Sequence, residues 1–228
     1  MTETTARDAD QEHLERSRKV WDRWSNYYGK SEQDFAPMLE EAVERLALDH
    51  GDTVLEIGCG PGVNFERLRR QVGAEGRIVA IDYSPKMVER DRERAANNGW
   101  GNIEVRRADA TTVSLDETFD GALASLSMSV MPDATAATRR VYDALAPGSR
   151  FVVFDLRTVP AGPLRAVNPF LSLFYRWFAN WNPDENVIGS LEATFDAVEV
   201  EQTYAAGACY RAVARKNSDR TDPVSGST

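Results

Sequence analysis

The amino-acid sequence predicts an α/β protein in which helices cover both faces of a mostly parallel, doubly wound sheet. The central observation is the segment 53–62, where a short apolar run ends in three glycines and a helical pattern follows. Short β-branched runs bounded by glycine are typical of buried parallel strands. Further apolar runs alternate with helical segments, which indicates helical crossovers between the strands. With 228 residues and 42% apolar composition, the chain is long enough for one domain with a substantial core.

The remaining elements follow in chain order. An amphipathic helix precedes the first strand, because apolar residues recur on one helical face from Phe35 to Leu46, with Pro37 in the first turn or at a kink. Helices are predicted over 64–71, 85–98 and 133–145. Strands are predicted at 77–82, 102–106, 119–125 and 150–155, and a terminal hairpin at 197–202 and 209–215.

The glycine loop does not carry the dinucleotide-binding pattern. That pattern places its third glycine at the sixth position, which here is Val63, whereas Gly62 comes one residue early. Glu56 stands near the end of the strand, where its charge would repel a pyrophosphate but favour a ligand that carries an ammonium or sulfonium group. A tight turn without a ligand remains the alternative for this loop.

A second acid follows the next predicted strand. Asp82 lies 20 positions after Gly62, as the ribose-binding acid does in nucleotide-binding folds. The alternative is that Asp82 caps the following helix. Ser84 and Pro85 are a better N-cap and first helical residue, which leaves Asp82 free to face a ligand.

A third acid, Asp109, follows the strand predicted at 102–106, and at this point a family resemblance is clear. The segments 54–62, 81–87, 108–110, 119–123 and 145–149 are similar, in order, to the class I S-adenosylmethionine-dependent methyltransferases. The resemblance covers roughly residues 20–155. It implies a Rossmann-like, seven-stranded sheet with an antiparallel last strand. It also implies S-adenosylmethionine as cofactor, S-adenosylhomocysteine as product and no metal.

The resemblance also implies which residues hold the cofactor. The glycine loop would hold the methionine part, Asp82 the ribose hydroxyls, and Asp109 with Ala110 the adenine edge. Asp22, Trp24 and Tyr28 match a cap segment in the branch that includes the ubiquinone and menaquinone C-methyltransferases and bacterial phospholipid N-methyltransferases, although these aromatics could simply pack the cap on the core. The expected cofactor contacts are Tyr28, Glu56, Gly58, Cys59, Gly60, Gly62, Asp82, Tyr83, Met87, Asp109, Ala110 and Ser125.

No histidine follows the fourth predicted strand, where many relatives have one. We expect His13 and His50, the only histidines, to lie away from the active end. A histidine base is therefore not predicted, and a neutral amine acceptor would need no strong base. The remaining candidate catalytic residues are Tyr28, Tyr27 and Asp155.

The segment 163–181 carries large apolar residues at helical spacing and lies outside the strand–helix alternation. We expect it to form a lid over an apolar, small-molecule or lipid-like methyl acceptor, with Met128, Phe170, Phe174 and Trp177 as substrate contacts. The alternative is ordinary core, because a helix in a small domain must bury one face.

Composition narrows the function and the location. The 36 acidic and 27 basic residues give a net charge of −9, which disfavours a nucleic-acid partner. Two cysteines provide no disulfide framework or metal cluster. Without an apolar run of about 20 residues, no transmembrane segment is expected, only weak membrane contact. We expect a cytoplasmic enzyme, and the oligomeric state stays open.

The expected domain organisation is simple. Residues 1–12 form a flexible N-terminus, 13–215 a single domain with cap helices at 13–49 and an inserted lid at 160–185, and 216–228 a disordered tail. Two other functions remain open: a nicotinamide-dependent oxidoreductase, opposed by Val63 and Glu56, and a non-catalytic cofactor-binding interaction module.

Overall fold

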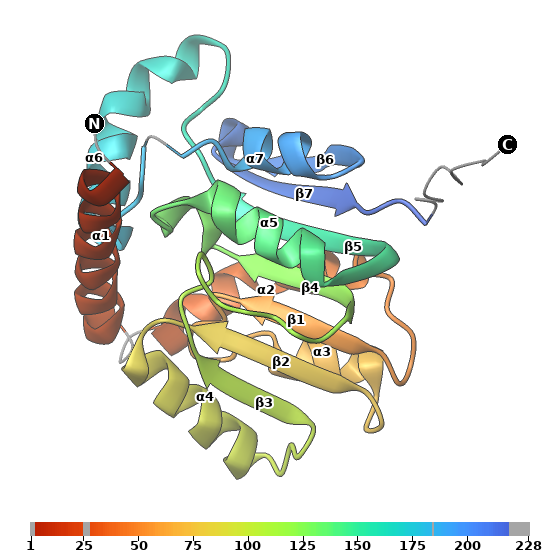
Figure 1. Ribbon diagram of the computed structural model, residues 1–228. Coiled ribbons are helices and arrows are strands. Elements are labelled where there is room, and N and C mark those ends of the chain that lie inside the picture. Colours follow the sequence, from red (N-terminus) through yellow and green to blue (C-terminus); the bar gives the residue numbers. More distant parts are fainter. Residues whose placement is uncertain (1–2, 25–27, 184, 219–228) are drawn as a thin grey trace, which may run out of the picture.

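The computed structural model describes residues 3–24, 28–183 and 185–218, and its centre is one seven-stranded sheet (Figure 1). The strand order is β3-β2-β1-β4-β5-β7-β6. Strands β1 to β5 pair in parallel, and β7 lies antiparallel between β5 and β6. This confirms the predicted mostly parallel sheet with an antiparallel last strand. The strands are β1 (Thr53–Ile57), β2 (Arg77–Asp82), β3 (Ile103–Arg107), β4 (Phe119–Ser125), β5 (Leu145–Leu156), β6 (Ala197–Tyr204) and β7 (Cys209–Arg215).

Helices cover both faces of the sheet, and each face has its own apolar cluster. Side chains alternate along a strand, so in β1 Val54 packs toward α2 and α3 while Leu55 and Ile57 pack toward α5 and α7. The helices are α1 (Glu3–Trp24), α2 (Tyr28–Glu44), α3 (Phe65–Val72), α4 (Pro85–Asn97), α5 (Ala134–Ala144), α6 (Asn168–Ala179) and α7 (Val187–Thr194), with short 3-10 turns η1 (Met128–Val130), η2 (Pro163–Val167) and η3 (Ala205–Gly207).

Several element boundaries differ from the sequence prediction. Helix α1 begins at Glu3, so it includes most of the segment 1–12 that the sequence predicts as a flexible N-terminus. Strand β5 begins at Leu145, which pairs with Phe119, so it includes residues predicted as a turn. The predicted single helix at 163–181 is a 3-10 turn followed by the shorter α6.

Helix α7 is missing from the sequence prediction. It is short and contains a glycine, so its intrinsic helix propensity is weak. Two tertiary features stabilise it instead. The side chain of Asn186 accepts a hydrogen bond from Gly189 N and caps the first turn, while Val187 and Leu191 are buried in the cluster that α5 also lines.

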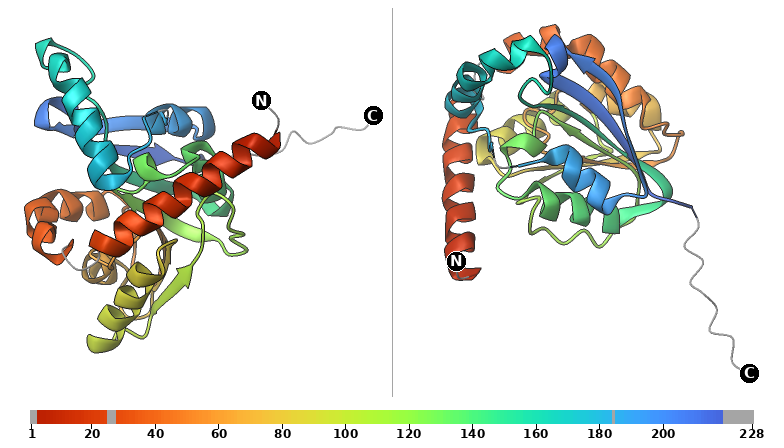
Figure 2. Two further views of the ribbon diagram at one scale, coloured as in Figure 1. Left: turned by 90° about the vertical axis from the view of Figure 1, so that its left-hand side faces the viewer. Right: turned by 90° about the horizontal axis from the view of Figure 1, so that it is seen from above.

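Helix α1 lies apart from the two layers that cover the sheet. The two further views show it as a long rod across the edge where the parallel strands end, close to α6 (Figure 2). This edge is the carboxyl end of the sheet, where ligands of doubly wound folds bind. Within the described ranges, no helix has both the length and the apolar composition that a bilayer crossing requires.

Candidate active site

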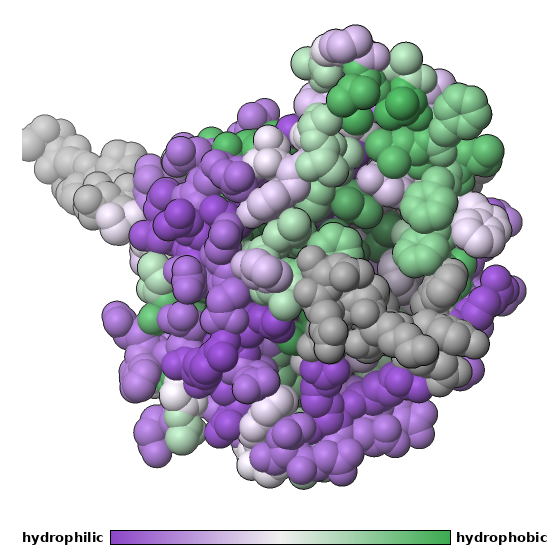
Figure 3. All heavy atoms as spheres, turned by 180° about the vertical axis from the view of Figure 1, so that it is seen from behind, coloured by the Kyte–Doolittle hydropathy of each residue, from purple (hydrophilic) through white to green (hydrophobic). Residues whose placement is uncertain are grey.

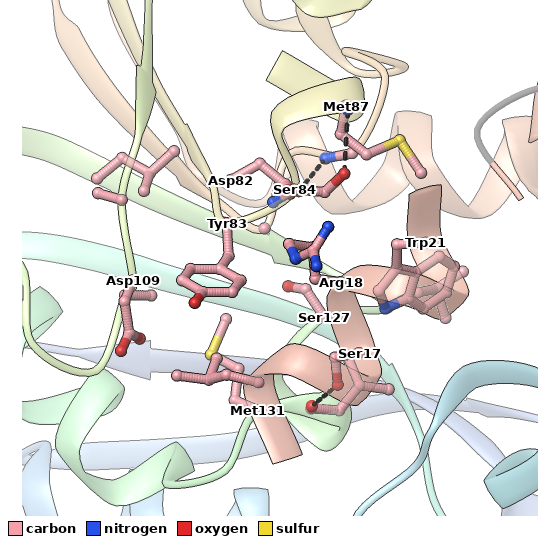
Figure 4. A pocket seen from close by; sticks show the side chains of 18 of the residues that line it. Ser17, Arg18, Trp21, Asp82, Tyr83, Ser84, Met87, Asp109, Ser127 and Met131 are labelled. Atoms are coloured by element: carbon pink, nitrogen blue, oxygen red, sulfur yellow. Dashed lines mark hydrogen bonds between the residues drawn. The ribbon is translucent and has the colours of Figure 1, made fainter. Parts of the chain in front are cut away.

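A pocket lies at the carboxyl ends of β1, β2 and β4, where the strand order reverses direction. The strand ends and the glycine loop form its floor, and α1 forms its roof, so the cap helix closes a site that the sheet begins (Figure 4). The residues that line it are Leu14, Ser17, Arg18, Trp21, Gly58, Gly60, Ile81, Asp82, Tyr83, Ser84, Met87, Ala108, Asp109, Ala110, Ser125, Leu126, Ser127, Val130 and Met131.

The glycine loop borders the pocket with bare backbone. Gly58 and Gly60 have φ values of 62° and 59°, a region that favours glycine. A Cβ atom at Gly58 would lie 2.3 Å from Ser127 Cβ, so no larger residue fits there. A Cβ atom at Gly60 would meet nothing within 4 Å, so this part of the loop faces open space. The loop can therefore accept a ligand directly against its main chain.

Asp82 is held at the end of β2 by two backbone donors. One carboxylate oxygen accepts from Gly60 N at 2.9 Å and the other from Ser84 N at 2.8 Å. The N-cap of α4 is Ser84, whose hydroxyl accepts from Met87 N, as the sequence predicts. Each Asp82 oxygen keeps acceptor capacity toward the pocket, which suits a vicinal diol. Desolvation raises the pKa of Asp82 to about 6.

The ends of β2 and β3 form a second polar corner. Tyr83 and Asp109 both line the pocket, and the Tyr83 ring lies between Asp82 and Asp109 in Figure 4. Asp109 Oδ1 accepts from Thr111 N at 2.9 Å and from Thr111 Oγ1 at 2.8 Å, which fixes its orientation. A fixed carboxylate beside the backbone of Ala110 is an arrangement that can recognise an amino-substituted ring.

Glu56 lies beneath the glycine loop rather than in the pocket lining. It is buried, and its Oε1 accepts from Asn64 Nδ2 at 2.7 Å, while the same amide donates to Ser125 Oγ at 3.1 Å. Glu56 Oε2 is buried without a partner among the described residues. Desolvation raises the pKa of Glu56 to about 7. An unmatched buried carboxylate oxygen at this place fits a cationic group on the ligand.

Cys59 and Gly62 lie behind the loop, outside the pocket lining. The Cys59 thiol donates to Asp91 Oδ2 at 2.9 Å, so the side chain points toward α4 and away from the pocket. Burial raises the pKa of the Cys59 thiol and raises that of Asp91 to about 9. A Cβ atom at Gly62 would lie 2.5 Å from Asp91 Oδ1. Both residues act on the shape of the loop and reach a ligand only through the backbone.

Helix α1 supplies lining residues that the sequence analysis missed. Leu14, Ser17, Arg18 and Trp21 recur at helical spacing and line the pocket. Figure 4 shows Ser17, Arg18 and Trp21 on α1. The spacing was readable in the sequence, but nothing in it says which surface the helix face covers.

His13 corrects the expectation that neither histidine lies at the active end. Its Nε2 is 2.9 Å from Val130 O, in the turn η1 that borders the pocket. Burial lowers the pKa of His13, so the ring is neutral near pH 7 and its Nε2–H donates to that carbonyl. This hydrogen bond from His13 holds α1 against η1.

Of the candidate catalytic residues, Asp155 is not part of the described pocket lining. Asp155, one residue before the end of β5, has a buried carboxyl that accepts from Ser129 Oγ at 2.6 Å, Ser129 N at 2.8 Å and Leu156 N at 2.7 Å. Desolvation raises its pKa to about 6, and its visible contacts hold η1 in place. Tyr28 is described only as the first residue of the α2 backbone, and Tyr27 lies outside the described residues.

The four expected substrate contacts do not come together. Met128, the first residue of η1, is fully buried in the core. In contrast, Phe170, Phe174 and Trp177 lie on α6 with 77%, 50% and 72% of their surfaces exposed. The alternative that these aromatic side chains are ordinary core is therefore wrong, while Tyr175 on the opposite face of α6 is buried.

Fold and pocket together define an α/β protein whose Asp82 carboxylate can accept from a ribose-like diol beside a bare glycine loop. Comparisons with known proteins agree. The model of a methyltransferase-domain family matches residues 48–213. Aklanonic acid methyltransferase DauC of Streptomyces sp. (strain C5) is 31% identical over 160 residues, which cover 68% of this chain and 73% of that protein.

Two further similarities have narrower scope. The ubiquinone/menaquinone biosynthesis C-methyltransferase UbiE of Enterobacter sp. (strain 638) is 34% identical over 116 residues, 50% of this chain and 46% of that protein. The chain thus spans only about half the length of this curated relative. A crystal structure of a SAM-dependent methyltransferase from Aquifex aeolicus shares the fold, with a TM-score of 0.58, 22% identity, and 78% and 88% of the two chains covered.

The chain belongs to the methyltransferase-domain family, and it is a class I S-adenosylmethionine-dependent methyltransferase. Membership in this family excludes the two other functions that the sequence left open, a nicotinamide-dependent oxidoreductase and a non-catalytic cofactor-binding module. The residues at the strand ends fit this cofactor, since Asp82 can accept from a diol and the orphaned Glu56 Oε2 lies below the loop.

Proposed function

We propose that this enzyme methylates a small, apolar acceptor that binds beside the cofactor under α1. The observation that carries the proposal is the division of the pocket into two chemically different parts. The ends of β2 and β3 contribute the polar side chains of Asp82, Tyr83 and Asp109, whereas α1 and the segment after β4 contribute apolar lining residues beside Ser17 and Arg18: Leu14, Trp21, Leu126, Val130 and Met131.

The polar part would hold the cofactor. Asp82 would accept from both ribose hydroxyls, Asp109 and the Ala110 backbone would bind the adenine edge, and the bare backbone at Gly60 would accept the methionine part. Glu56 would offset the cofactor's positive charge from below the loop. When bound, S-adenosylmethionine supplies an electrophilic methyl group on its sulfonium, and the main task of the protein is then to align the acceptor atom with it.

The apolar part would bind the acceptor. Its walls come from α1 and from the segment after β4, and the acids in the described pocket lining are Asp82 and Asp109, which both belong to the cofactor part. Without a nearby base in that lining, the acceptor atom must be nucleophilic by itself, as a neutral amine or a readily ionised hydroxyl or carbon acid is. DauC, which is 31% identical to this chain over 160 residues, carries the name of an aklanonic acid methyltransferase, and this name supports a small-molecule acceptor.

Helix α6 would guide the acceptor to this pocket. Asn180, at its C-terminal cap, donates to Ser17 Oγ at 2.8 Å, and Ser17 lines the pocket. The exposed aromatic residues Phe170, Phe174 and Trp177 would meet an apolar acceptor before it passes between α1 and α6. The lid role expected for this segment therefore remains part of the proposal.

Two measurements test the proposal. Calorimetry should show binding of S-adenosylmethionine and none of NAD. A screen with methyl-labelled cofactor should then show transfer to apolar phenols, quinols or amines and little transfer to hydrophilic amines of the same nucleophilicity. Transfer confined to hydrophilic acceptors would contradict the apolar part of the proposal, and absence of S-adenosylmethionine binding would contradict the assignment of the pocket.

A further inference from the structure

Helix α6 is apolar on two opposite faces, only one of which the protein covers. Tyr175 and Ala179 are buried against the body of the protein. The other face is a stripe at i, i+3, i+4 and i+7 that η2 extends, and we call these six exposed residues the α6 stripe: Leu164, Val167, Phe170, Leu173, Phe174 and Trp177. A helix that is apolar all round is normally buried on all sides.

The α6 stripe forms one continuous patch. Seen from behind, hydrophobic side chains gather over the part of the molecule that α6 occupies, and hydrophilic side chains dominate the surface below and beside it (Figure 3). The stripe contains nearly all of the large apolar side chains that are strongly exposed in the described structure, since Val200 is the other one and is 37% exposed. Patches of this kind mark interaction sites in soluble proteins.

The charge around the stripe is opposite to that of the chain. The segment 156–183 contains Arg157, Arg165 and Arg176 and no acidic residue, although the whole chain carries a net charge of −9. Arg157 is engaged, because it donates to Gly207 O and lies over the Tyr210 ring. Arg165 and Arg176 are exposed at the two ends of the stripe, and among the described residues neither forms an ion pair.

We propose that the α6 stripe is a docking surface for an anionic lipid bilayer, on which α6 lies in the plane of the interface. Phe and Trp on one face with arginines beside them match the composition of interfacial helices. Because the segment 156–183 holds Arg165 and Arg176 and no acidic residue, an approach with α6 foremost brings these cationic groups to the lipid headgroups. The stripe would sink into the boundary between headgroups and acyl chains, and binding would be weak and reversible, as for one short helix.

A second copy of this chain fits the stripe less well. A twofold dimer brings the same patch of both copies together, so the arginine-bearing surfaces would face each other. A bilayer satisfies both features of the patch, since acyl chains receive the aromatic residues and anionic headgroups receive Arg165 and Arg176. The docking proposal does not depend on the identity of the methyl acceptor, although it places α6 where an apolar acceptor dissolved in lipid would be met.

Cosedimentation of the full chain with lipid vesicles tests the proposal. Vesicles of phosphatidylcholine and phosphatidylglycerol should bind the protein at low salt, and vesicles of phosphatidylcholine alone should bind it much less. Phe170→Gln combined with Trp177→Gln should abolish binding. Since both side chains are mostly exposed, the variant should fold normally, with circular dichroism and S-adenosylmethionine affinity unchanged.

A pair of matched charge variants separates position from net charge. Arg165→Glu with Arg176→Glu should weaken binding to anionic vesicles about tenfold or more, given about 1 kcal/mol per basic residue near the surface. Arg139→Glu with Arg140→Glu changes the net charge equally on exposed residues of α5, in the layer on the sheet face away from α2, and should weaken binding far less.

Three results would overturn the proposal. One is no binding to anionic vesicles at low salt, and another is equal binding by wild type and the Phe170→Gln, Trp177→Gln variant. The third is a wild-type protein that is a dimer in light scattering and does not bind vesicles, together with a Phe170→Gln, Trp177→Gln variant that is a monomer. That last result would assign the stripe to a second copy of the chain.

Discussion

The floor and the roof of the pocket are built by different means. On the floor, Gly58 and Asp82 are fixed by hydrogen bonds from backbone amides, since Gly58 N donates to Ile81 O at 2.7 Å and Asp82 accepts from the amides of Gly60 and Ser84. On the roof, α1 is held by side chains: Asp22 accepts from Ser84 Oγ at 2.6 Å, and Asn180 reaches Ser17 from the end of α6.

This difference separates the two binding tasks. A floor anchored by backbone hydrogen bonds moves only if these bonds break, so it suits a cofactor that binds in the same place in every turnover. A roof held by a few side-chain contacts can open and close at low cost, which suits the entry of an acceptor. Substitutions on the floor should therefore change cofactor affinity most, and substitutions on the roof should change acceptor kinetics.

The largest effect is expected at Asp82. Asp82→Ala removes charge-assisted hydrogen bonds of about 1.5–3 kcal/mol each, so S-adenosylmethionine affinity should fall at least tenfold in calorimetry while the fold is retained. Glu89→Ala, on the exposed side of α4, is the matched control and should bind normally. Unchanged affinity in folded Asp82→Ala would remove Asp82 from the cofactor site and, with it, the contrast between floor and roof.

The same contrast explains what the sequence could predict. Glu56, Asp82 and Asp109 lie at or just after the ends of strands with strong β patterns. Because parallel strands bring their carboxyl ends to one edge of the sheet, their positions in the sequence were enough to predict that these three acids lie close together. The place of α1 was not predictable, because it depends on tertiary contacts such as that between His13 and Val130 O. Local periodicity shows only that a helix has an apolar face.

Helix α6 also shows that helical periodicity does not tell which surface an apolar face contacts. Its stripe has the same spacing whether the face is buried or exposed, so the spacing left ordinary core open beside the expected lid. The structure leaves Phe170 and Trp177 more than two-thirds exposed. In the same way, Cys59 stands in the glycine motif, yet its side chain faces Asp91 of α4, a tertiary contact that the local sequence does not reveal.

The second effect concerns stability of the floor without its ligand. Glu56 is buried and its pKa is raised to about 7, whereas an unfolded glutamate has a pKa of about 4.3. Between these values the native state holds a proton that the unfolded chain has released, so the ligand-free enzyme loses stability as pH rises through this window. Glu56→Gln removes this loss and should raise the free energy of unfolding at about pH 8 by about 1–3 kcal/mol.

Denaturant unfolding at about pH 5 and about pH 8 measures this effect. The stabilisation of Glu56→Gln should appear only at the higher pH. The variant should also bind S-adenosylmethionine more weakly, since the neutral amide of glutamine cannot offset the positive charge of the cofactor. Glu66→Gln, at an exposed position of α3, should follow the wild type at both pH values. Equal pH dependence in wild type and Glu56→Gln would show that Glu56 is ionised in the ligand-free protein.

A smaller effect is expected on the roof at Asn180, which has a φ of 53° and donates to Ser17 Oγ and to His13 O. Asn180→Gly keeps this left-handed backbone conformation and removes only the side chain. Loss of neutral hydrogen bonds of about 0.5–1.5 kcal/mol should raise the acceptor KM about threefold to tenfold. S-adenosylmethionine affinity should change less than about twofold.

Steady-state kinetics with the acceptor found in the screen measures the change at Asn180. Asn98→Gly, at the C-terminal end of α4, removes an asparagine that caps its own helix and should leave the acceptor KM unchanged. Equal losses of cofactor and acceptor binding in Asn180→Gly would show that roof and floor act as one unit.

The finest test of the floor is Asp109→Asn, which keeps the shape of the side chain and changes one acceptor into a donor. Asp109 Oδ1 is held by Thr111 N and Thr111 Oγ1. The amide oxygen of Asn would take this position, because both partners donate, and the amide nitrogen would then face the pocket. It would meet the exocyclic amine of adenine as a second donor, so S-adenosylmethionine should bind about threefold to tenfold more weakly. An inosyl analogue presents a carbonyl oxygen at the same place and should lose much less, which would narrow the preference of the enzyme for adenosyl over inosyl. If competition binding gave the same preference for wild type and variant, Asp109 would lie outside the adenine site, and the ends of β1 and β2 alone would define the cofactor floor.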